Sequence, residues 1–458
     1  MKHTDIYDVL KRPELLGQEV TVCGWVRTFR DSAAVAFLEL ADGTSFPRLQ
    51  IVIDKNALKV DPECTKLGAS VSVKGEVVKA FKGEGHELNA KEVTLLGKCP
   101  PEYPIQKKRT TLEFLRSIPH LRLRTNTFNA VFRVRSVAAQ AVHRYFHEHR
   151  YYYVHTPIIT ASDCEGAGEM FRVTTQPYNA KCESEQDYYK NDFFGVKAGL
   201  SVSGQLEGEV AAMAFSKIYT FGPSFRAENS NTTRHVAEFW HIEPEVAFAE
   251  LPDIIEIAED MVKYLIRAVL DECPDEIAFF DSFVEKGLKD KLEHVASSDF
   301  AVCDYTDAIS ILQKADVKFQ YPVDWGCDLQ TEHEKYLTEV VFKRPVFVTN
   351  YPKEIKSFYM KQNPDGKTVA ATDLLVPGIG EIIGGSQREE RLDLLTKRMQ
   401  ELGLREEDYW WYLDLRRYGS CRHAGFGLGF ERMVMYLTGV SNIRDVELHP
   451  RTVGNADF

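Results

Sequence analysis

The stretch FGPSFRAENSNTTRHVAEFWHIEPE, residues 221–245, decides the fold that this chain of 458 residues is predicted to adopt. In its second arm, residues 238–243, side chains fall alternately on two faces, and a period of two is typical of a β-strand. The first arm, residues 218–225, is also strand-like, and the run NSNTT between the arms consists of loop formers. We therefore predict a long β-hairpin, one face of which carries arginines, a histidine, carboxylates and an aromatic ring.

That face is suited to a nucleotide, because arginine binds phosphate through paired donors and its guanidinium plane stacks. The alternative is a solvated hairpin with ordinary surface ion pairs. A second stretch, AGFGLGFERMVMYLTG at residues 424–439, favours the nucleotide. Its first half has glycine at every second position, which predicts a strand that another group approaches closely. Its second half predicts an apolar helix that ends at Gly439.

Together the two stretches resemble motifs 2 and 3 of the class II aminoacyl-tRNA synthetases, and their details resemble the asparaginyl enzymes of the aspartyl-like subclass. A helix predicted from residue 130 and a strand containing Pro157 resemble motif 1, which forms the dimer interface in that family. The resemblance implies an α+β fold, with an N-terminal OB-fold β-barrel and then a class II catalytic domain built on an antiparallel sheet flanked by helices. The expected domains are residues 1–100, an anticodon-binding barrel; 101–129, a basic linker; and 130–458, the catalytic domain, with an insertion around 271–345.

The barrel is also predicted directly, since five short alternating runs in the first hundred residues suit a small Greek-key barrel. Such barrels bind single-stranded bases with aromatic and basic side chains. The resemblance implies that Arg27, Phe37 and Gln50 bind the anticodon. Phe37 would stack on a base, and Gln50 would form a hydrogen bond with a base edge. From pattern alone, the barrel core is the favoured place for Phe37, and only the family resemblance reverses that prediction.

Composition limits the class of protein. The net charge of −12 argues against a general nucleic-acid coat protein, yet residues 107–135 carry eight Lys and Arg against one acid. That basic band predicts a local phosphate contact, the alternative being a solvated linker. Nine scattered cysteines without a CxxC pair argue against a disulfide framework or structural zinc and favour a cytoplasmic protein. No signal peptide or membrane span is predicted.

The resemblance implies a nucleotide site in which Arg226 and Arg432 are the catalytic residues, Arg226 on the α-phosphate and Arg432 stacked with Phe239 around the adenine. Mg²⁺ would be the cofactor, held by Glu381 and Asp373, as carboxylates and phosphate oxygens are its usual ligands. Gly384 stands where aspartyl relatives have a metal-binding serine, which leaves the number of ions open. The full implied ATP set is Arg226, Glu228, Arg234, His235, Phe239, Glu381 and Arg432.

The amino-acid site implied by the resemblance has two ends. Glu165 and Glu243 would approach the α-amino group, and Arg388 the side-chain carbonyl. Aspartyl relatives have a lysine three residues after the glutamine at position 205, where this chain has Gly208 followed by Glu209. A carboxylate in place of a cation repels aspartate and accepts from an amide, which points to asparagine. The implied set is Glu165, Gln205, Glu209, Glu243 and Arg388.

The function expected from these residues is ATP-dependent activation of asparagine and its transfer to tRNA(Asn) by a homodimer that pairs through residues 130–160. Two other enzymes stay open: an aspartyl-tRNA synthetase, including one that does not discriminate between the two tRNAs, and an ATP-dependent asparagine synthetase on the same catalytic fold. A non-catalytic relative is a third alternative. The predicted barrel and basic band argue against the amide synthetase, which needs no anticodon reader.

Overall fold

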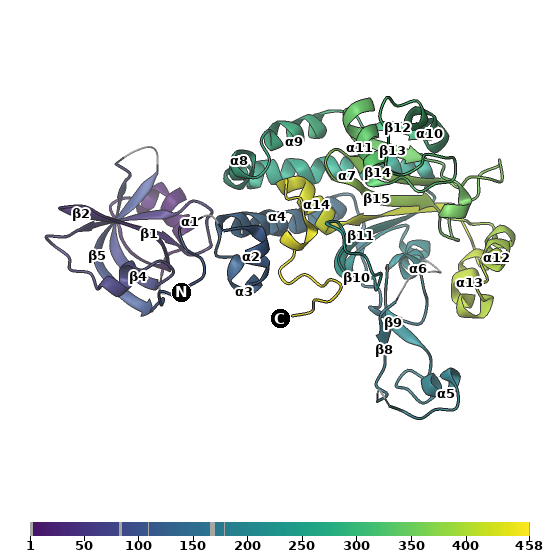
Figure 1. Cartoon of the computed structure of the whole chain (residues 1–458), viewed down its shortest axis with the longest axis horizontal. Coiled ribbons are helices and arrows are strands. Elements are labelled where there is room, and N and C mark those ends of the chain that lie inside the picture. The colour runs from purple at the N-terminus through teal and green to yellow at the C-terminus, as the bar shows by residue number, and fades with distance from the viewer. Residues whose placement is uncertain (1–2, 82–84, 109, 165–169, 178, 458) are drawn as a thin grey trace. The chain divides into compact units, whose positions relative to one another are not determined.

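The computed structural model describes residues 3–81, 85–108, 110–164, 170–177 and 179–457, and the chain folds as two compact units, Met1–Phe132 and Arg133–Phe458 (Figure 1). Helix α4 (Asn126–Glu148) begins in the first unit and continues into the second. The other elements of the first unit are α1 (Ile6–Lys11), η1 (Pro13–Leu15), β1 (Glu19–Asp31), β2 (Val35–Ala41), β3 (Leu49–Asp54), η2 (Pro62–Thr65), β4 (Ser70–Lys79), β5 (His86–Gly97), α2 (Leu112–Arg116) and α3 (Pro119–Arg122).

The first unit is built on a closed barrel with strand order β1-β2-β3-β5-β4, so the predicted OB-fold barrel is confirmed. All neighbours are antiparallel except β3 and β5, whose parallel pairing closes the barrel. Alternate residues fill the interior, as Leu38 and Leu40 do from β2. Because Phe37 lies between buried Ala36 and Leu38, its side chain belongs to the outer face and not to the barrel core.

The second unit contains an eight-stranded sheet in the order β12-β13-β14-β15-β16-β11-β10-β6. The central pairs are antiparallel, while the two outermost pairs, β12–β13 and β10–β6, are parallel. A separate small sheet has the order β7-β9-β8. The strands are β6 (Tyr152–Tyr153), β7 (Ile159–Thr160), β8 (Arg172–Val173), β9 (Ala198–Leu200), β10 (Lys217–Phe225), β11 (Glu238–Ala247), β12 (Ala301–Asp304), β13 (Val346–Thr349), β14 (Ala371–Val376), β15 (Gly380–Gln387) and β16 (His423–Gly429).

Helices pack on this sheet and hold its central strands. Helix α7 contacts β14, β15 and β16, whereas α6 contacts β10 and β11. None of the helices in the described part of the chain is long and apolar enough to cross a bilayer. The helices are α5 (Glu185–Lys190), α6 (Gln205–Phe215), α7 (Leu251–Glu272), α8 (Pro274–Phe283), α9 (Leu288–Ser297), α10 (Tyr305–Gln313), α11 (Thr331–Lys335), η3 (Tyr336–Val341), η4 (Lys353–Ile355), α12 (Leu392–Glu401), η5 (Glu406–Asp408), α13 (Trp410–Arg417), α14 (Phe430–Thr438) and η6 (Ile443–Asp445).

The hairpin and the glycine-rich strand predicted from the sequence are neighbours in the centre of the sheet. Strands β10 and β11 form an antiparallel hairpin, and β16 pairs with β11 so that Glu245 lies opposite Gly425. The chain then enters α14, whose end is capped by Gly439 at φ +69°, a conformation that favours glycine. The two motif-like stretches, almost two hundred residues apart in the chain, therefore form one surface.

Part of the segment 271–345 belongs to the main sheet. Its strand β12 pairs in parallel with β13 and supplies one edge of the main sheet, with alternate residues Ala301 and Cys303 buried. Its helix α10 packs on the same two strands. This segment therefore supplies an edge strand of the second unit's main sheet.

Candidate functional site

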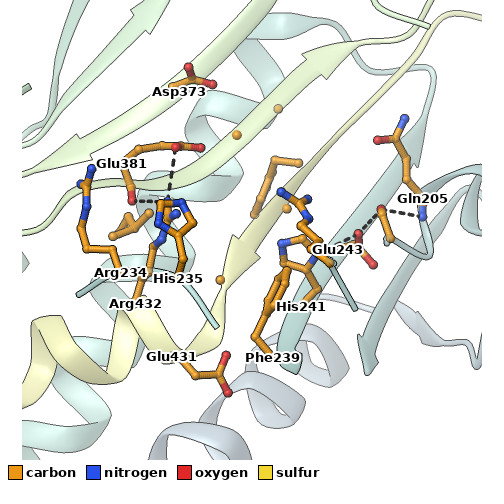
Figure 2. Close-up of a pocket in the computed structure, with 18 of the residues that line it drawn as sticks. Gln205, Arg234, His235, Phe239, His241, Glu243, Asp373, Glu381, Glu431 and Arg432 are labelled. Carbon is orange, nitrogen blue, oxygen red and sulfur yellow. Dashed lines mark hydrogen bonds and ion pairs between the residues drawn. The ribbon is translucent and has the colours of Figure 1, made fainter. Parts of the chain in front are cut away.

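A cavity of about 320 Å³ opens over the central strands of the second unit. Figure 2 shows Gln205 and Glu243 at one end of this cavity and Asp373, Glu381 and Arg432 at the other. Of the predicted ATP, metal and amino-acid residues, Glu165 lies outside the described part of the chain and Glu209 does not line the cavity. Those that line it are Gln205, Arg226, Glu228, Arg234, His235, Phe239, Glu243, Asp373, Glu381, Arg388 and Arg432.

The alternating glycines of β16 leave room for side chains from β11. A Cβ at Gly425 would lie 2.3 Å from Oε1 of Glu245, closer than any real methyl group could approach. A Cβ at Gly427, by contrast, would meet nothing nearer than His241 Nε2 at 3.7 Å. The close approach predicted from the glycine pattern is therefore confirmed at Gly425, and the group that approaches is the carboxylate of Glu245.

Glu245 and Arg388 form a buried ion pair at one end of the cavity. Arg388 Nε donates to Glu245 Oε2 at 3.2 Å, and a second, shorter bond joins Arg388 Nη2 to Glu245 Oε1. Arg388 Nη1 donates to Ser386 Oγ at 2.9 Å, and the Tyr359 ring lies under the guanidinium. Burial raises the pKa of Glu245 to about 7 against the opposing effect of Arg388, and the nearby carboxylates of Glu209 and Glu243 add to the rise.

Glu209 lies beneath the cavity, fully buried, which corrects its predicted position in the site. Its Oε1 accepts from Tyr412 Oη at 2.9 Å and from Gln205 Nε2 at 3.1 Å. Its Oε2 lies 2.9 Å from both Arg416 Nη2 and His423 Nε2. Burial opposes ionisation, yet Arg416 and His423 hold the pKa of Glu209 well below its usual value. With four polar neighbours already present, this carboxylate orients Gln205 and does not face the cavity.

Glu243 is held in place by donors from three segments. Its Oε2 accepts from the Gly204 amide at 3.0 Å and from Thr220 Oγ1 at 2.9 Å, and its Oε1 accepts a short bond from the Ser203 hydroxyl. His241 Nδ1 lies 3.4 Å from the same Oε1. Although burial opposes it, these contacts, led by His241, lower the pKa of Glu243 to about 2. The carboxylate is therefore anionic near neutral pH, at the end of the cavity that also holds Gln205.

Further arginines line the cavity, Arg226 beside Phe239, and Arg234 and Arg432 at the end that holds Glu381. The Arg226 guanidinium lies over the ring of Phe239, 5.4 Å from its centre, as expected of a stacked pair. Arg432 Nη1 donates to the Glu381 carbonyl at 3.0 Å and to its Oε2 at 3.3 Å. Burial, together with the nearby Arg432 and Arg234, lowers the pKa of His235. Three arginines and a neutral imidazole near one cavity suit a polyphosphate.

Arg234 is anchored on its outer side. Its Nη1 donates to Glu334 Oε2 at 3.1 Å and to the Ile379 carbonyl at 2.5 Å, and its Nη2 bonds Thr331. Gly380 permits this arrangement, since a Cβ there would lie 2.6 Å from Arg234 Nη1, and its φ of +91° favours glycine. These bonds hold the guanidinium in place at the edge of the cavity.

Two carboxylates that could hold a cation meet beside Gly384. A Cβ at that glycine would lie 3.3 Å from Glu381 Oε1 and 3.5 Å from Asp373 Oδ1. Lys356 Nζ bonds Asp373 at 2.6 Å, while burial raises the Asp373 pKa. Burial opposes ionisation of Glu381, but Arg432 and Lys356 lower its pKa. In the described residues no three His, Cys, Asp or Glu side chains converge on one point, so these two carboxylates would need oxygens from a ligand to complete a Mg²⁺ site.

The barrel carries a separate polar patch on its outer face. Gln50 lies between Arg30 and Glu87, accepting from Arg30 Nη2 at 2.8 Å and donating to Glu87 Oε1 at 2.8 Å. The Arg30 guanidinium also lies 5.5 Å from the centre of the Phe37 ring. Arg27 has other neighbours: its Nη2 lies 3.5 Å from Asn126 Oδ1. The structure thus brings Phe37 and Gln50 together with Arg30, and the predicted third member, Arg27, lies in a different cavity.

Three residues of these sites were missed by the sequence analysis. Glu245 is two positions beyond Glu243, and the alternation of β11 could have placed it on the same face. Arg30 is three positions beyond Arg27, and the β-bulge between Val26 and Thr28 shifts the pairing of β1 with β2 in between. Lys356 gave no sequence signal, because its contact with Asp373 joins two separate segments.

Comparisons with known proteins give one consistent result. Residues 111–453 match the family model "tRNA synthetases class II (D, K and N)", and residues 20–96 match "OB-fold nucleic acid binding domain". The asparagine–tRNA ligase of Clostridium botulinum (strain Eklund 17B / Type B) is 59% identical, with 100% of both chains covered. That of Acetivibrio thermocellus is 60% identical, with 97% of both chains covered.

Solved structures agree with the sequence relatives. Asparaginyl-tRNA synthetase from Pyrococcus horikoshii complexed with asparaginyl-adenylate superposes with a TM-score of 0.86 at 35% identity, covering 100% of this chain and 99% of that one. A putative aspartyl-tRNA synthetase from Leishmania major Friedlin superposes at 0.78 with 22% identity, covering 100% and 94%, and this likeness concerns the fold alone.

We expect Gly425→Ala to destabilise the second unit, because the new methyl group would displace the Glu245 carboxylate from Arg388. Overpacking a filled site costs about 1–3 kcal/mol. Urea unfolding followed by circular dichroism measures the loss. Gly427→Ala is the matched control on the same strand and should cost less than about 0.5 kcal/mol; equal stabilities of the two variants would contradict the close approach.

Proposed function

This chain belongs to the class II tRNA synthetases for aspartate, lysine and asparagine, and we propose that its own activity is that of an asparagine–tRNA ligase. It activates asparagine with ATP to asparaginyl-adenylate and pyrophosphate, and then transfers the asparaginyl group to the terminal ribose of tRNA(Asn). The observation that carries the choice of amino acid is the buried pair of Glu245 and Arg388 at the end of the cavity.

The side-chain amide of asparagine presents one acceptor and one donor, and this pair offers the complement. Arg388 donates to the amide oxygen, and Glu245 accepts from the amide nitrogen. Aspartate would place a second anion against Glu245 in a site from which water is largely excluded, and an unpaired buried charge is costly. Glu245 thus takes the selecting role that the sequence analysis gave to Glu209, and Glu209 acts through Gln205 as a positioning residue.

The position that carries a lysine in aspartyl relatives is directly beside this pair. A Cβ at Gly208 would lie 3.7 Å from Glu245 Cγ and 3.4 Å from Ile218 Cδ1. The glycine leaves no cation there to neutralise an aspartate side chain. This local chemistry argues against the aspartyl alternative, as does the high identity to asparagine–tRNA ligases.

At the other end of the cavity, the residues bind and orient ATP. Arg226 holds the α-phosphate, and Phe239 and Arg432 lie on the two faces of the adenine, whose amino group bonds Glu228. Arg234 and His235 contact the outer phosphates. The carboxylate oxygen of asparagine attacks the α-phosphorus, the bond to pyrophosphate breaks, and the fixed guanidinium groups stabilise the charge that develops. No protein nucleophile is needed.

The α-amino group and the reacting carboxylate of asparagine are bonded to the same carbon atom, and the α-amino group binds at the end of the cavity that holds Glu243 and Gln205. Glu243, anionic near neutral pH, attracts this ammonium, and Gln205 lies beside it. Glu165 is the further carboxylate that the family resemblance assigns to the same group. These contacts fix the substrate so that its carboxylate points toward the nucleotide end.

Mg²⁺ fits the two carboxylates beside Gly384. Glu381 and Asp373 would hold the ion with oxygens of the ATP phosphates, since Mg²⁺ in nucleotide sites takes one or two protein carboxylates. When bound, it supplies neutralisation of phosphate charge. Lys356 and Arg432, which pair with these carboxylates, keep the same region neutral before ATP enters.

The barrel binds the anticodon of tRNA on the patch formed by Arg30, Phe37 and Gln50. Phe37 offers a half-buried ring for stacking, and Gln50 offers an amide held in position by Arg30 and Glu87. An amide synthetase would have no use for this patch. The presence of the barrel therefore favours the ligase over that alternative.

A homodimer is the assembly that the second unit's surface supports. Around the motif-1-like region 130–160, large apolar side chains are exposed, and Tyr152 packs against Phe215 with ring centres 5.0 Å apart. Contiguous exposed apolar surface marks protein contacts, and a two-fold dimer is the commonest way to cover it. The exposed apolar residues of this face are Tyr152, Tyr153, Ile158, Ile159, Val210 and Phe215.

Amino-acid-dependent ATP–pyrophosphate exchange tests the function and its selector. We expect the rate of exchange with asparagine to be at least about a hundredfold higher than the rate with aspartate. This ratio corresponds to the free-energy cost of leaving a buried polar group unpaired. Because the Glu245 pKa is raised to about 7, the carboxylate becomes protonated as the pH falls. The protonated form accepts poorly from an amide and can donate to aspartate, so the preference should decrease from pH 8 to pH 6.

The matched variants for this assay are Glu245→Gln and Glu209→Gln. Glu245→Gln should lose most of the preference and all of its pH dependence between 6 and 8. Glu209→Gln should weaken activity with both amino acids alike, since it acts through Gln205. If wild-type protein activates aspartate as well as asparagine, the proposed function is refuted; if only Glu209→Gln changes the preference, Glu209 and not Glu245 is the selector.

Phe37→Ala should weaken charging of tRNA while leaving tRNA-independent exchange unchanged. Loss of one stacked base is worth about 1–3 kcal/mol, which corresponds to a rise in the tRNA KM of about 5- to 150-fold. Phe81→Ala, at an exposed aromatic elsewhere in the same unit, is the control and should charge normally. Normal charging by Phe37→Ala would refute the proposed anticodon patch.

Sedimentation velocity at micromolar concentration should show a dimer. Ile159→Asp places a charge on the exposed apolar face and should shift the protein to a monomer. Phe283→Asp changes an equally apolar, exposed residue of the same unit outside this face and should leave the dimer intact. A wild-type monomer, or dissociation by both variants alike, would contradict the assignment of the interface.

A further inference from the structure

A second cavity, of about 220 Å³, lies within the first unit. Three arginines line it: Arg27 from β1, Arg48 from the start of β3, and Arg124 from the basic band that follows the barrel. Three aromatic residues, Trp25, Phe46 and Tyr103, line it as well. None of the three residues of the proposed anticodon patch belongs to this cavity, so it is a separate site.

The cavity concentrates positive charge. Arg27 Nη2 and Arg48 Nη2 both donate to Asn126 Oδ1, at 3.5 and 2.6 Å, so one neutral acceptor serves two guanidinium groups. Among the described residues, one of the three arginines forms an ion pair: Arg48 Nη1 lies 3.0 Å from Glu39 Oε2. Burial lowers the pKa of Arg27, and the cations Arg48 and Arg124 lower it further. An anion in the cavity would relieve this repulsion.

The aromatic lining adds a second requirement on the ligand. The Arg124 guanidinium lies 5.9 Å from the ring centres of both Trp25 and Tyr103. Trp25 is 44% exposed, so a flat apolar surface remains open beside the charges. Guanidinium groups together with exposed rings bind the phosphates and the sugars or bases of nucleotides.

The position of the cavity indicates where such a ligand comes from. Glu39, which pairs with Arg48, lies two residues from Phe37 on the same outer face of β2, and it pairs in register with Gln50 of β3. Two residues along a strand span about 7 Å, so Glu39 and Phe37 are close neighbours on this face. A polynucleotide whose bases occupy the anticodon patch therefore continues directly toward Arg48.

From this geometry we infer that the cavity of Arg27, Arg48 and Arg124 binds a backbone phosphate of tRNA, next to the anticodon patch and independently of base sequence. The inference rests on the proposed function in that it takes tRNA as the partner. Phosphate contacts fix register and carry no sequence information, so this site contributes affinity and orientation while the patch contributes specificity. It also gives the basic band a defined role through Arg124.

The test compares Arg124→Gln and Arg48→Gln with Arg12→Gln, which removes the same charge from an exposed ion pair on α1. Dissociation constants for tRNA(Asn) and for a non-cognate tRNA are measured by filter binding from 50 to 300 mM NaCl. We expect each cavity variant to weaken binding of both tRNAs by the same factor, about tenfold at low salt. Each should reduce the slope of log K against log[NaCl] by about 1, the value for one lost phosphate contact.

Further measurements keep the proposal separable from a folding defect and from the proposed function. Arg124→Lys retains the charge and should keep the wild-type salt slope, whereas a structural defect would change binding without changing the slope. Asparagine-dependent exchange in the absence of tRNA should be the same in all variants; its absence in the wild type would refute the ligase function and leave the phosphate site untouched.

Three outcomes would overturn the inference: tRNA binding and salt slope unchanged in Arg124→Gln and Arg48→Gln, an effect confined to the cognate tRNA, or an equal effect in Arg12→Gln. A free nucleotide is the other source of the same chemistry. If AMP titrated calorimetrically binds the wild type but not Arg124→Gln, without any change in tRNA affinity, the cavity serves a mononucleotide and not tRNA.

Discussion

The carboxylate of Glu245, buried against Arg388, is the interaction on which the catalytic unit depends. It requires a glycine at position 425 on the neighbouring strand, a β-hairpin in the register that places residue 245 opposite it, and an arginine on the segment that follows β15. Three segments far apart in the chain must therefore meet within a few ångströms. A buried ion pair contributes little net stability, because desolvation offsets the attraction. Its value here is chemical: it presents an acceptor and a donor side by side.

Behind this pair, a second buried network holds the site in position. Glu209 is surrounded by Tyr412, Arg416, His423 and Gln205, so that its charge is compensated without contact with the cavity. Removing one partner of such a network leaves a buried charge unpaired, which is strongly destabilising. The network thereby fixes Gln205 near the anionic carboxylate of Glu243, and Arg226, Arg234 and Arg432 line the same cavity. In the proposed function, the ammonium group of asparagine binds at Glu243, and the α-carboxylate on the same carbon atom faces the arginines and the nucleotide.

The barrel also holds polar side chains in fixed positions, but on an exposed surface. Its interior is filled by one set of alternating residues, and the other set forms an outer face on which Phe37, Glu39 and Gln50 are neighbours. Polar side chains on this face are fixed by one another, as Gln50 is by Arg30 and Glu87, which limits the entropy lost when a base binds. The proposed base patch and the arginine cavity both take residues from β1 and from the region of β3, so the two proposed sites adjoin on the barrel.

The sequence by itself determined the elements and most of the site, because alternation, turn formers and glycine spacing are local properties. The hairpin, the helix ending at Gly439 and the five-stranded barrel were all predicted within a few residues of their observed limits. The tertiary structure alone decided which side chains face the ligand. Glu209 and Glu245 are both carboxylates of the second unit, and their sequence context does not tell them apart. Only the packing of α13 against α6 shows that Arg416 and Tyr412 bond the Glu209 carboxylate. Likewise, a β-bulge in β1 separates Arg27 from Phe37 and brings Arg30 to it. The physical reason is that a side chain's partners come from segments distant in the chain, and no local pattern records them.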